Sequence, residues 1–160
     1  MVTQIRDPGL CYASVRVVPH CVAVGQQRAL TVKVQSNAKG VGIGVLPVGH
    51  PNLSSEDLWL PGHSGCALCI DCSWYTNSDG IGCFWHGGNI RDAPVGFGSG
   101  VEVRAVVDRR RGSGNGVVRF YRNGEALAEA ELLPIVFPEE AVFVVSFGYA
   151  CGGVKILSFE

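Results

Sequence analysis

The alternation of apolar and polar side chains is clearest between residues 98 and 133. Between residues 101 and 107 every second side chain is apolar: Val101, Val103, Ala105 and Val107. Polar side chains such as Glu102 and Arg104 occupy the positions between them. Because successive side chains of a strand point to opposite faces, this period of two predicts a β-strand with one buried face.

A β-hairpin is predicted directly after that strand. Residues 117–122 are rich in β-branched and aromatic side chains and end at Asn123-Gly124, the dipeptide that best tolerates the positive φ angles of a type I′ turn. Beyond the turn every second residue of 126–132 is apolar, which predicts a third strand over residues 125–133. A helix is the alternative there, because Glu, Ala and Leu are strong helix formers, although the turn leaves little room for a helix nucleus.

The first third of the chain carries similar signals. Residues 29–35 alternate, with Leu30, Val32 and Val34 on one face. A turn at residues 37–40 leads into residues 41–46, so we expect a second hairpin there. Residues 15–24 are broken by Pro19 and predict either two short strands or one bulged edge strand, because proline cannot donate to a central ladder.

The remaining strands are predicted over residues 66–75, 81–86, 141–147 and 154–159. The apolar run 141–147 lacks alternation, as in a strand buried on both faces. In the last strand we expect Val154 and Ile156 on one face and Leu157 and Phe159 on the other. About ten short strands, 22 glycines and eight prolines favour an all-β fold, an antiparallel β-sandwich or barrel.

Composition narrows the function classes. A chain of 160 residues with 47% hydrophobic and 17% charged side chains is typical of one globular domain. The formal net charge of −1 argues against nucleic acid as a partner, because that binding needs a positive surface. The run Arg109-Arg110-Arg111 is interpreted as a solvated loop between strands.

The expected location is intracellular, with the cytoplasm as the first choice. The N-terminus lacks the apolar core of a signal peptide, and no apolar run approaches the length needed to cross a bilayer, so no membrane association is expected. Seven cysteines, an odd number, together with no secretion signal, favour reduced thiols.

Cysteines at spacing three give the sharpest metal-like signal in the chain. They are Cys66, Cys69 and Cys72, with His63 three residues earlier. An iron–sulfur run would need a further cysteine where Thr76 stands, and a structural zinc site more often uses two separated Cys-x-x-Cys pairs. We therefore expect buried thiols and no bound metal, and these three cysteines are the only metal candidates.

No set of residues points to catalysis or to a cofactor. Glu129 and Glu131 lie two apart and would share a strand face, as acids do in sandwich glucanases, but no aromatic sugar platform lies nearby in sequence, so we expect a solvated face. The glycine-rich stretches do not precede a helix and are not dinucleotide fingerprints. The sequence predicts no catalytic residues and no cofactor.

An ordered set of motifs resembles the SPRY domain family. It consists of Gly44-Val45, Ser73-Trp74-Tyr75, Asp79-Gly80, His86-Gly87-Gly88, a strand closing on Asp108, and the hairpin Phe120-Tyr121-Arg122-Asn123-Gly124. The resemblance covers about residues 29–159 and implies a bent, two-sheet, concanavalin A-like sandwich. We expect residues 1–28 to form a lead-in and edge strands, and residues 29–160 to form the SPRY-like sandwich. The resemblance also makes His86 a sheet-stabilising residue.

SPRY domains of understood function bind extended peptides on a rim of loops. Carried onto this chain, the resemblance implies that the peptide-binding residues are Asn37, Lys39, Trp59, Leu60 and Tyr149. For Trp59 and Tyr149 a place at the edge of the core is the alternative. We expect Trp74 and Trp85 in the core. The predicted function is thus a non-catalytic module that binds a peptide segment of a partner protein, and the alternative is a carbohydrate-binding or glycan-hydrolysing protein on the same sandwich.

Overall fold

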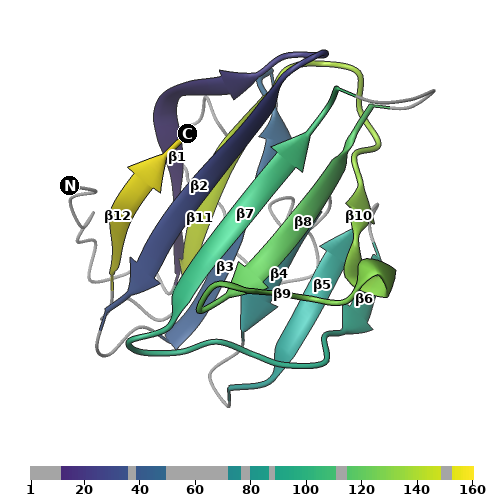
Figure 1. Cartoon of the computed structure of the whole chain (residues 1–160). Coiled ribbons are helices and arrows are strands. Elements are labelled where there is room, and N and C mark those ends of the chain that lie inside the picture. Colours follow the sequence, from purple (N-terminus) through teal and green to yellow (C-terminus); the bar gives the residue numbers. More distant parts are fainter. Residues whose placement is uncertain are drawn as a thin grey trace.

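The computed structural model describes residues 12–35, 39–49, 72–76, 80–86, 89–110, 115–148 and 153–160. Within them the chain forms twelve strands in two antiparallel sheets that pack face to face, and the single helical element is one short turn (Figure 1). The predicted all-β two-sheet sandwich is confirmed. Among the described residues, no helix has the length and apolarity that crossing a membrane requires.

The first sheet lies at the back in Figure 1 and has six strands. Their spatial order is β1 (Tyr12–Val22), β11 (Ala141–Gly148), β3 (Lys39–Pro47), β4 (Cys72–Thr76), β5 (Gly82–His86) and β6 (Asn89–Asp92). We call it the back sheet. Ala141, Val142, Phe143 and Val145 of β11 are all fully buried, which confirms the prediction of a buried strand for this segment.

The second sheet, the front sheet, faces the viewer in Figure 1. Its order is β10 (Leu133–Pro134), β8 (Val117–Arg122), β7 (Glu102–Asp108), β2 (Gln27–Val34) and β12 (Val154–Phe159), and β9 (Glu125–Ala126) also pairs with β8. Val103, Ala105 and Val107 of β7 point into the core, as their alternation predicts.

The hairpin at Asn123-Gly124 is confirmed. Both residues have positive φ, 50° and 84°, as a type I′ turn requires, and Arg122 pairs with Glu125 across it. The long third strand is wrong, because β9 has only two residues and η3 (Glu129–Glu131), a single 3₁₀ turn, precedes β10. Leu127 packs against the core here, so the chain leaves the ladder before it rejoins β8 as β10.

The second predicted hairpin is also wrong. β2 lies in the front sheet between β7 and β12, whereas β3 lies in the back sheet between β11 and β4. The chain therefore crosses from one sheet to the other between these two strands. Turn residues between two alternating runs are equally compatible with a crossing, so local sequence cannot distinguish it from a hairpin.

Two irregular strands lie near the chain ends. β1 is one edge strand with a register shift between Arg16 and Cys21, the bulged form of the two alternatives. In β12 the register shifts between Ile156 and Ser158, which makes Leu157 an extra residue. The shift brings Phe159 opposite Leu30 and onto the core, where its ring meets Phe143 edge-on at 5.9 Å. Phe159 thus shares the core face with Val154 and Ile156, and the expectation that it lies on the opposite face is wrong.

The core between the sheets is built around aromatic rings. Trp74 of β4 is fully buried, as predicted, and its ring centroid lies 4.6 Å from Phe97, 5.9 Å from Phe120 and 6.3 Å from Phe84. Its indole N–H donates to the carbonyl of Val95 at 3.1 Å. Trp85 is not part of this core, because it is half-buried in a smaller cluster with Leu46, Val142 and Val144 on the outer face of the back sheet.

The interpretation of Arg109 as a solvated residue is wrong. Arg109 is 3% exposed, and its guanidinium donates to backbone carbonyls of the described residues: those of Asn115 at 2.6 Å, Pro138 at 3.2 Å, Val22 and Phe137 at 3.3 Å, and Glu139. Burial lowers the pKa of Arg109, and the carboxylates of Glu139 and Glu140 partly offset that effect. Arg110 does lie in solvent, paired with Asp108, and Arg111 lies outside the described residues.

Candidate peptide-binding end of the sandwich

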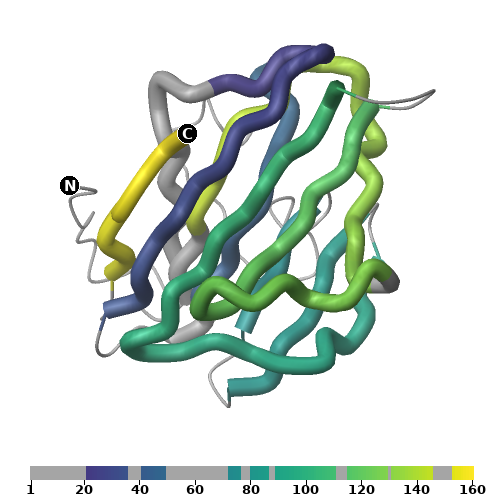
Figure 2. The backbone as a smooth tube through the Cα atoms, in the orientation of Figure 1, coloured from purple at the N-terminus to yellow at the C-terminus, as the bar shows by residue number. Residues whose placement is uncertain are grey.

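One end of the sandwich holds two of the segments to which the predicted peptide-binding residues belong. We call it the rim end: β2 and β11 end there, and β3, β7 and β12 begin there. In Figure 2 the chain that leads into β7 runs along this lower end of the molecule. Backbone hydrogen bonds from Gln35 N to Gly153 O (2.9 Å) and from Gly100 N to Val34 O (2.8 Å) tie these strand ends together.

The five predicted binding residues stay a prediction. Asn37, Trp59, Leu60 and Tyr149 lie outside the described residues, as does the side chain of Lys39. The backbone register nevertheless fixes where their segments are attached. Lys39 pairs with Gly148, so the segments holding Asn37 and Tyr149 are attached side by side at the rim end.

The segment that holds Trp59 and Leu60 is attached elsewhere. It follows Gly49 and precedes Cys72. Pro47 pairs with Ala141 and Val45 with Cys72, so both of its attachment points lie near the other end of β3. The register therefore brings together the attachment points of two of the three predicted segments and not those of the third.

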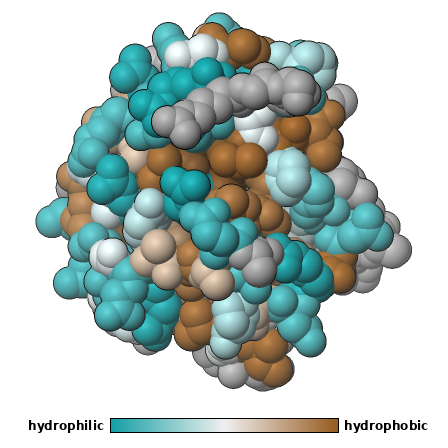
Figure 3. All heavy atoms as spheres, turned by 45° about the vertical axis from the view of Figure 1, so that its right-hand side comes forward, coloured by the Kyte–Doolittle hydropathy of each residue, from teal (hydrophilic) through white to brown (hydrophobic). Residues whose placement is uncertain are grey.

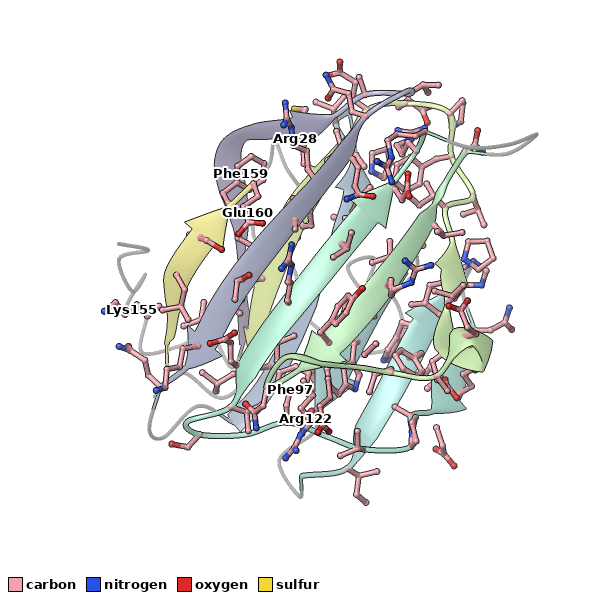
Figure 4. The ribbon with its side chains drawn as sticks, in the orientation of Figure 1. Arg28, Phe97, Arg122, Lys155, Phe159 and Glu160 are labelled. Atoms are coloured by element: carbon pink, nitrogen blue, oxygen red, sulfur yellow. The ribbon has the colours of Figure 1, made fainter. Side chains whose placement is uncertain are left out.

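The strands beneath the rim end are held by side-chain hydrogen bonds. Thr76 is 4% exposed and its hydroxyl oxygen accepts from the backbone N–H of Phe97 at 2.8 Å. Arg122 Nε donates to the carbonyl of Gly96 at 3.1 Å, and Figure 4 shows Phe97 and Arg122 together at this end. The Asn123 side-chain oxygen accepts from Glu102 N at 2.9 Å. The segments attached here thus start from fixed positions, which lowers the ordering cost of binding.

Two exposed lysines lie at the rim end, and the sequence analysis did not single them out. Lys33 of β2 pairs with Lys155 of β12 in the antiparallel register, and on its other side with Glu102 of β7. Figure 4 shows Lys155 at the outer edge of the front sheet. The signal was available in the sequence, because Lys33, Lys39 and Lys155 are its only lysines.

Apolar side chains are exposed on the opposite edge of the sandwich. Figure 3 turns that edge forward and shows apolar side chains bordered by hydrophilic ones. Among the exposed residues are Ile90 of β6, at 57%, and Val136 after β10, at 50%. Ile90 lies on the edge strand β6, three strands away from β3, so it provides a control position for tests of the rim.

Cys72, one of the three cysteines considered as metal ligands, has a structural role. Its thiol is fully buried and donates to the carbonyl of Pro134 at 3.1 Å. His86, which pairs with Cys72 across β4 and β5, has Nε2 2.6 Å from the same carbonyl and so ties the back sheet to β10 of the front sheet. Cys66, Cys69 and His63 lie outside the described residues, and among the described ones no three potential ligands group to hold a metal.

Glu129 and Glu131 do not form a carboxylate pair on a strand. Both lie in η3, and the Glu129 side chain is 83% exposed, whereas the Glu131 side chain is 17% exposed and pairs with Arg91 at 3.1 Å. The expected shared strand face is wrong, because the chain leaves the ladder after β9. Glu131 instead ties the η3 turn to β6, since Arg91 belongs to that strand and also lies over the Phe84 ring.

The outer face of the back sheet offers a second, smaller site. Ser73 is 5% exposed, and its hydroxyl has no hydrogen-bond partner among the residues that the structure describes. It pairs with the half-buried Trp85 across β4 and β5. Burial raises the pKa of the neighbouring Cys83 thiol, a hydrogen bond from Trp85 lowers it, and the charge of Asp92 raises it. The Ser73 hydroxyl is closed off from solvent, whereas the indole of Trp85 is partly exposed on this face.

Comparison with known proteins supports the fold. No family model and no curated protein matches the chain. The SPRY domain of human HERC1 is 18% identical, with a TM-score of 0.58 over 92% of this chain and 82% of that one. Another human SPRY domain is 12% identical, with a TM-score of 0.58 over 91% and 83%. Galectin-Ib of Xenopus laevis is 13% identical, with a TM-score of 0.49 over 92% and 98%. The chain therefore has the two-sheet fold of a SPRY domain.

Proposed function

We propose that this protein is a non-catalytic interaction module that binds a peptide segment of a partner protein at its rim end. The observation that carries the proposal is the joint attachment of residues 36–38 and 149–152 to paired strands. The SPRY fold supports it, since the resemblance of the sequence to that family implies peptide contacts from these same segments. Aromatic anchors such as Tyr149 suit this role, because they bury large areas at low rotamer cost.

We also propose that the module is non-catalytic and acts inside the cell. The carboxylates of Glu129 and Glu131 are exposed or ion-paired and lie in η3 rather than on one strand face, which favours binding over hydrolysis. The intracellular location rests on the seven cysteines of the sequence, an odd number that favours reduced thiols.

A peptide-binding measurement tests the proposal. Peptides of 12 residues selected from a random display library on the full chain are titrated by calorimetry against wild type and a Tyr149→Ala variant. We expect Tyr149→Ala to weaken binding about tenfold or more, because an aromatic anchor at the centre of an interface contributes about 2 kcal/mol. Ile90→Ala is the matched control and leaves affinity unchanged. Equal affinity of wild type and Tyr149→Ala, with circular dichroism and melting confirming the fold of the variant, would refute this rim.

Carbohydrate binding is the second candidate function, favoured by Trp85. Its half-buried indole can stack on a sugar ring, and the Ser73 hydroxyl beside it is closed off from solvent and would reach that sugar only after a side-chain rearrangement. A glycan array compares wild type with Trp85→Ala. Binding above background that this variant abolishes would favour the second candidate, and hydrolysis lost in Glu129→Gln would add an enzymatic role.

A further inference from the structure

All three lysines of the chain are concentrated at the rim end. Lys33 is the second-last residue of β2, Lys155 the second residue of β12 and Lys39 the first residue of β3. The ten arginines, in contrast, are spread over the whole chain. Lys33 and Lys39 therefore flank residues 36–38, and Lys155 follows residues 149–152.

Lys33 and Lys155 are placed at a cost to stability. They are direct partners on neighbouring antiparallel strands, where like charges repel. Both side chains are exposed, and none of the ion pairs among the described residues includes either of them. Glu102, on the far side of Lys33, is the acidic residue in register with this pair.

The two segments that flank the pair provide no further carboxylate. Residues 34–41 and 148–155 contain neither Asp nor Glu. Three arginines elsewhere do have carboxylate partners: Arg91 pairs with Glu131, Arg104 with Glu160 and Arg110 with Asp108. The corner of the rim end formed by β2 and β12 thus carries two lysines in register with the single carboxylate of Glu102.

We propose that the rim end selects partner segments that carry Asp or Glu, with Lys33 and Lys155 as the residues that read this charge. The inference rests on the peptide-binding function proposed above and defines its ligand class. A carboxylate between the two ammonium groups replaces their mutual repulsion by two attractions. A long lysine stem can follow carboxylates at different positions along the peptide, so the pair selects for charge rather than for one fixed residue.

Matched peptides separate charge from shape. Each 12-residue peptide on an array is synthesised as a twin, with Asp and Glu in one form and Asn and Gln in the other. The tightest acidic peptide is then labelled with fluorescein and titrated by anisotropy against wild type and a Lys33→Gln/Lys155→Gln variant. Arg28→Gln is the control, because Arg28 is exposed on the same strand β2 at its other end (Figure 4).

We expect the acidic twin to bind more tightly and the double lysine variant to weaken it about fivefold to tenfold, as two exposed ion pairs predict. The Arg28 control binds as wild type, and added salt weakens only the acidic twin. Equal binding of both twins, or full affinity in the lysine variant, overturns the inference, while loss of binding in Tyr149→Ala would still support peptide binding at the rim end. Tighter binding of a fluorescein-labelled 12-nucleotide single-stranded DNA than of the acidic peptide, lost in the lysine variant, also overturns it.

Discussion

Lys33 and Lys155 stand opposite each other across the β2–β12 strand pair, two like charges at adjacent positions of one sheet. Their repulsion predicts that Lys155→Glu raises the free energy of unfolding by about 0.5 kcal/mol, because an attractive cross-strand pair replaces a repulsive one. The same change weakens binding of the acidic peptide. Lys155→Gln, which removes the repulsion without adding an attraction, should fall between wild type and Lys155→Glu in urea unfolding. A loss of stability in Lys155→Glu would contradict the assigned pairing.

Substitution of Arg109, far from the rim end, should strongly lower the free energy of unfolding. Arg109→Met removes the donors for carbonyls of Val22, Phe137 and Pro138, which come from two separate parts of the chain. We expect a loss of about 3 kcal/mol in the free energy of unfolding, because buried acceptors lose their partners. Arg110→Met, at the exposed neighbour, leaves the urea midpoint unchanged. Equal midpoints for both variants would show that Arg109 does not hold these segments.

At Gly44, in the centre of the back sheet, the neighbouring strand leaves no room for a side chain. A Cβ atom at this position would lie 2.2 Å from the carbonyl oxygen of Cys72 and 2.5 Å from Ser73 Cβ on the neighbouring strand. Gly44→Ala should therefore cost about 2 kcal/mol through displacement of β4. Gly49→Ala is the control, since a Cβ there meets nothing within 4 Å. Thermal melting compares the two variants, and an unchanged melting temperature for Gly44→Ala would contradict the β3–β4 register.

The alkylation rate of Cys83 should depend on pH differently in the folded and in the unfolded protein. Burial raises the pKa of its thiol, so less thiolate is present in the folded protein than in an unfolded chain at the same pH. Alkylation of Cys83 by iodoacetamide, followed by mass spectrometry, should reach half its limiting rate at a higher pH than in the urea-unfolded protein. Stability linked to this thiol is present below the unfolded pKa and is lost as pH rises through the folded one. A midpoint at or below that of the unfolded chain would contradict the burial.

Local sequence predicts those parts of the fold that depend on local chemistry. The Asn123-Gly124 turn follows from two positive φ angles that few other residue pairs adopt, and the buried face of β7 follows from its alternation. Both features depend on neighbours in the chain. The strand predicted after that turn begins at Glu125 but ends at Ala126, where Leu127 packs against the core.

The errors occur where distant segments decide the structure. From the sequence, Arg109 is predicted to be a solvated charge, because it belongs to a basic run. The carbonyls of residues 22 and 137–139 that surround it are brought there by the fold. Phe159 changes face because Leu157 is an extra residue in the register with β2. The crossing between β2 and β3 is likewise a property of the two sheets. The predicted binding residues from Asn37 to Tyr149 rest on the family resemblance, and the structure adds the positions to which their segments are attached.

The most direct test of the central claim, peptide binding at the rim end, is amide hydrogen exchange of the full chain with and without a selected 12-residue peptide. Exchange reports local protection segment by segment. We expect new protection in residues 34–41 and 148–155, and none in residues 23–28 or 138–140 at the opposite end. Protection confined to residues 72–76 and 82–86, on the back sheet, would contradict the claim and favour the site at Ser73 and Trp85.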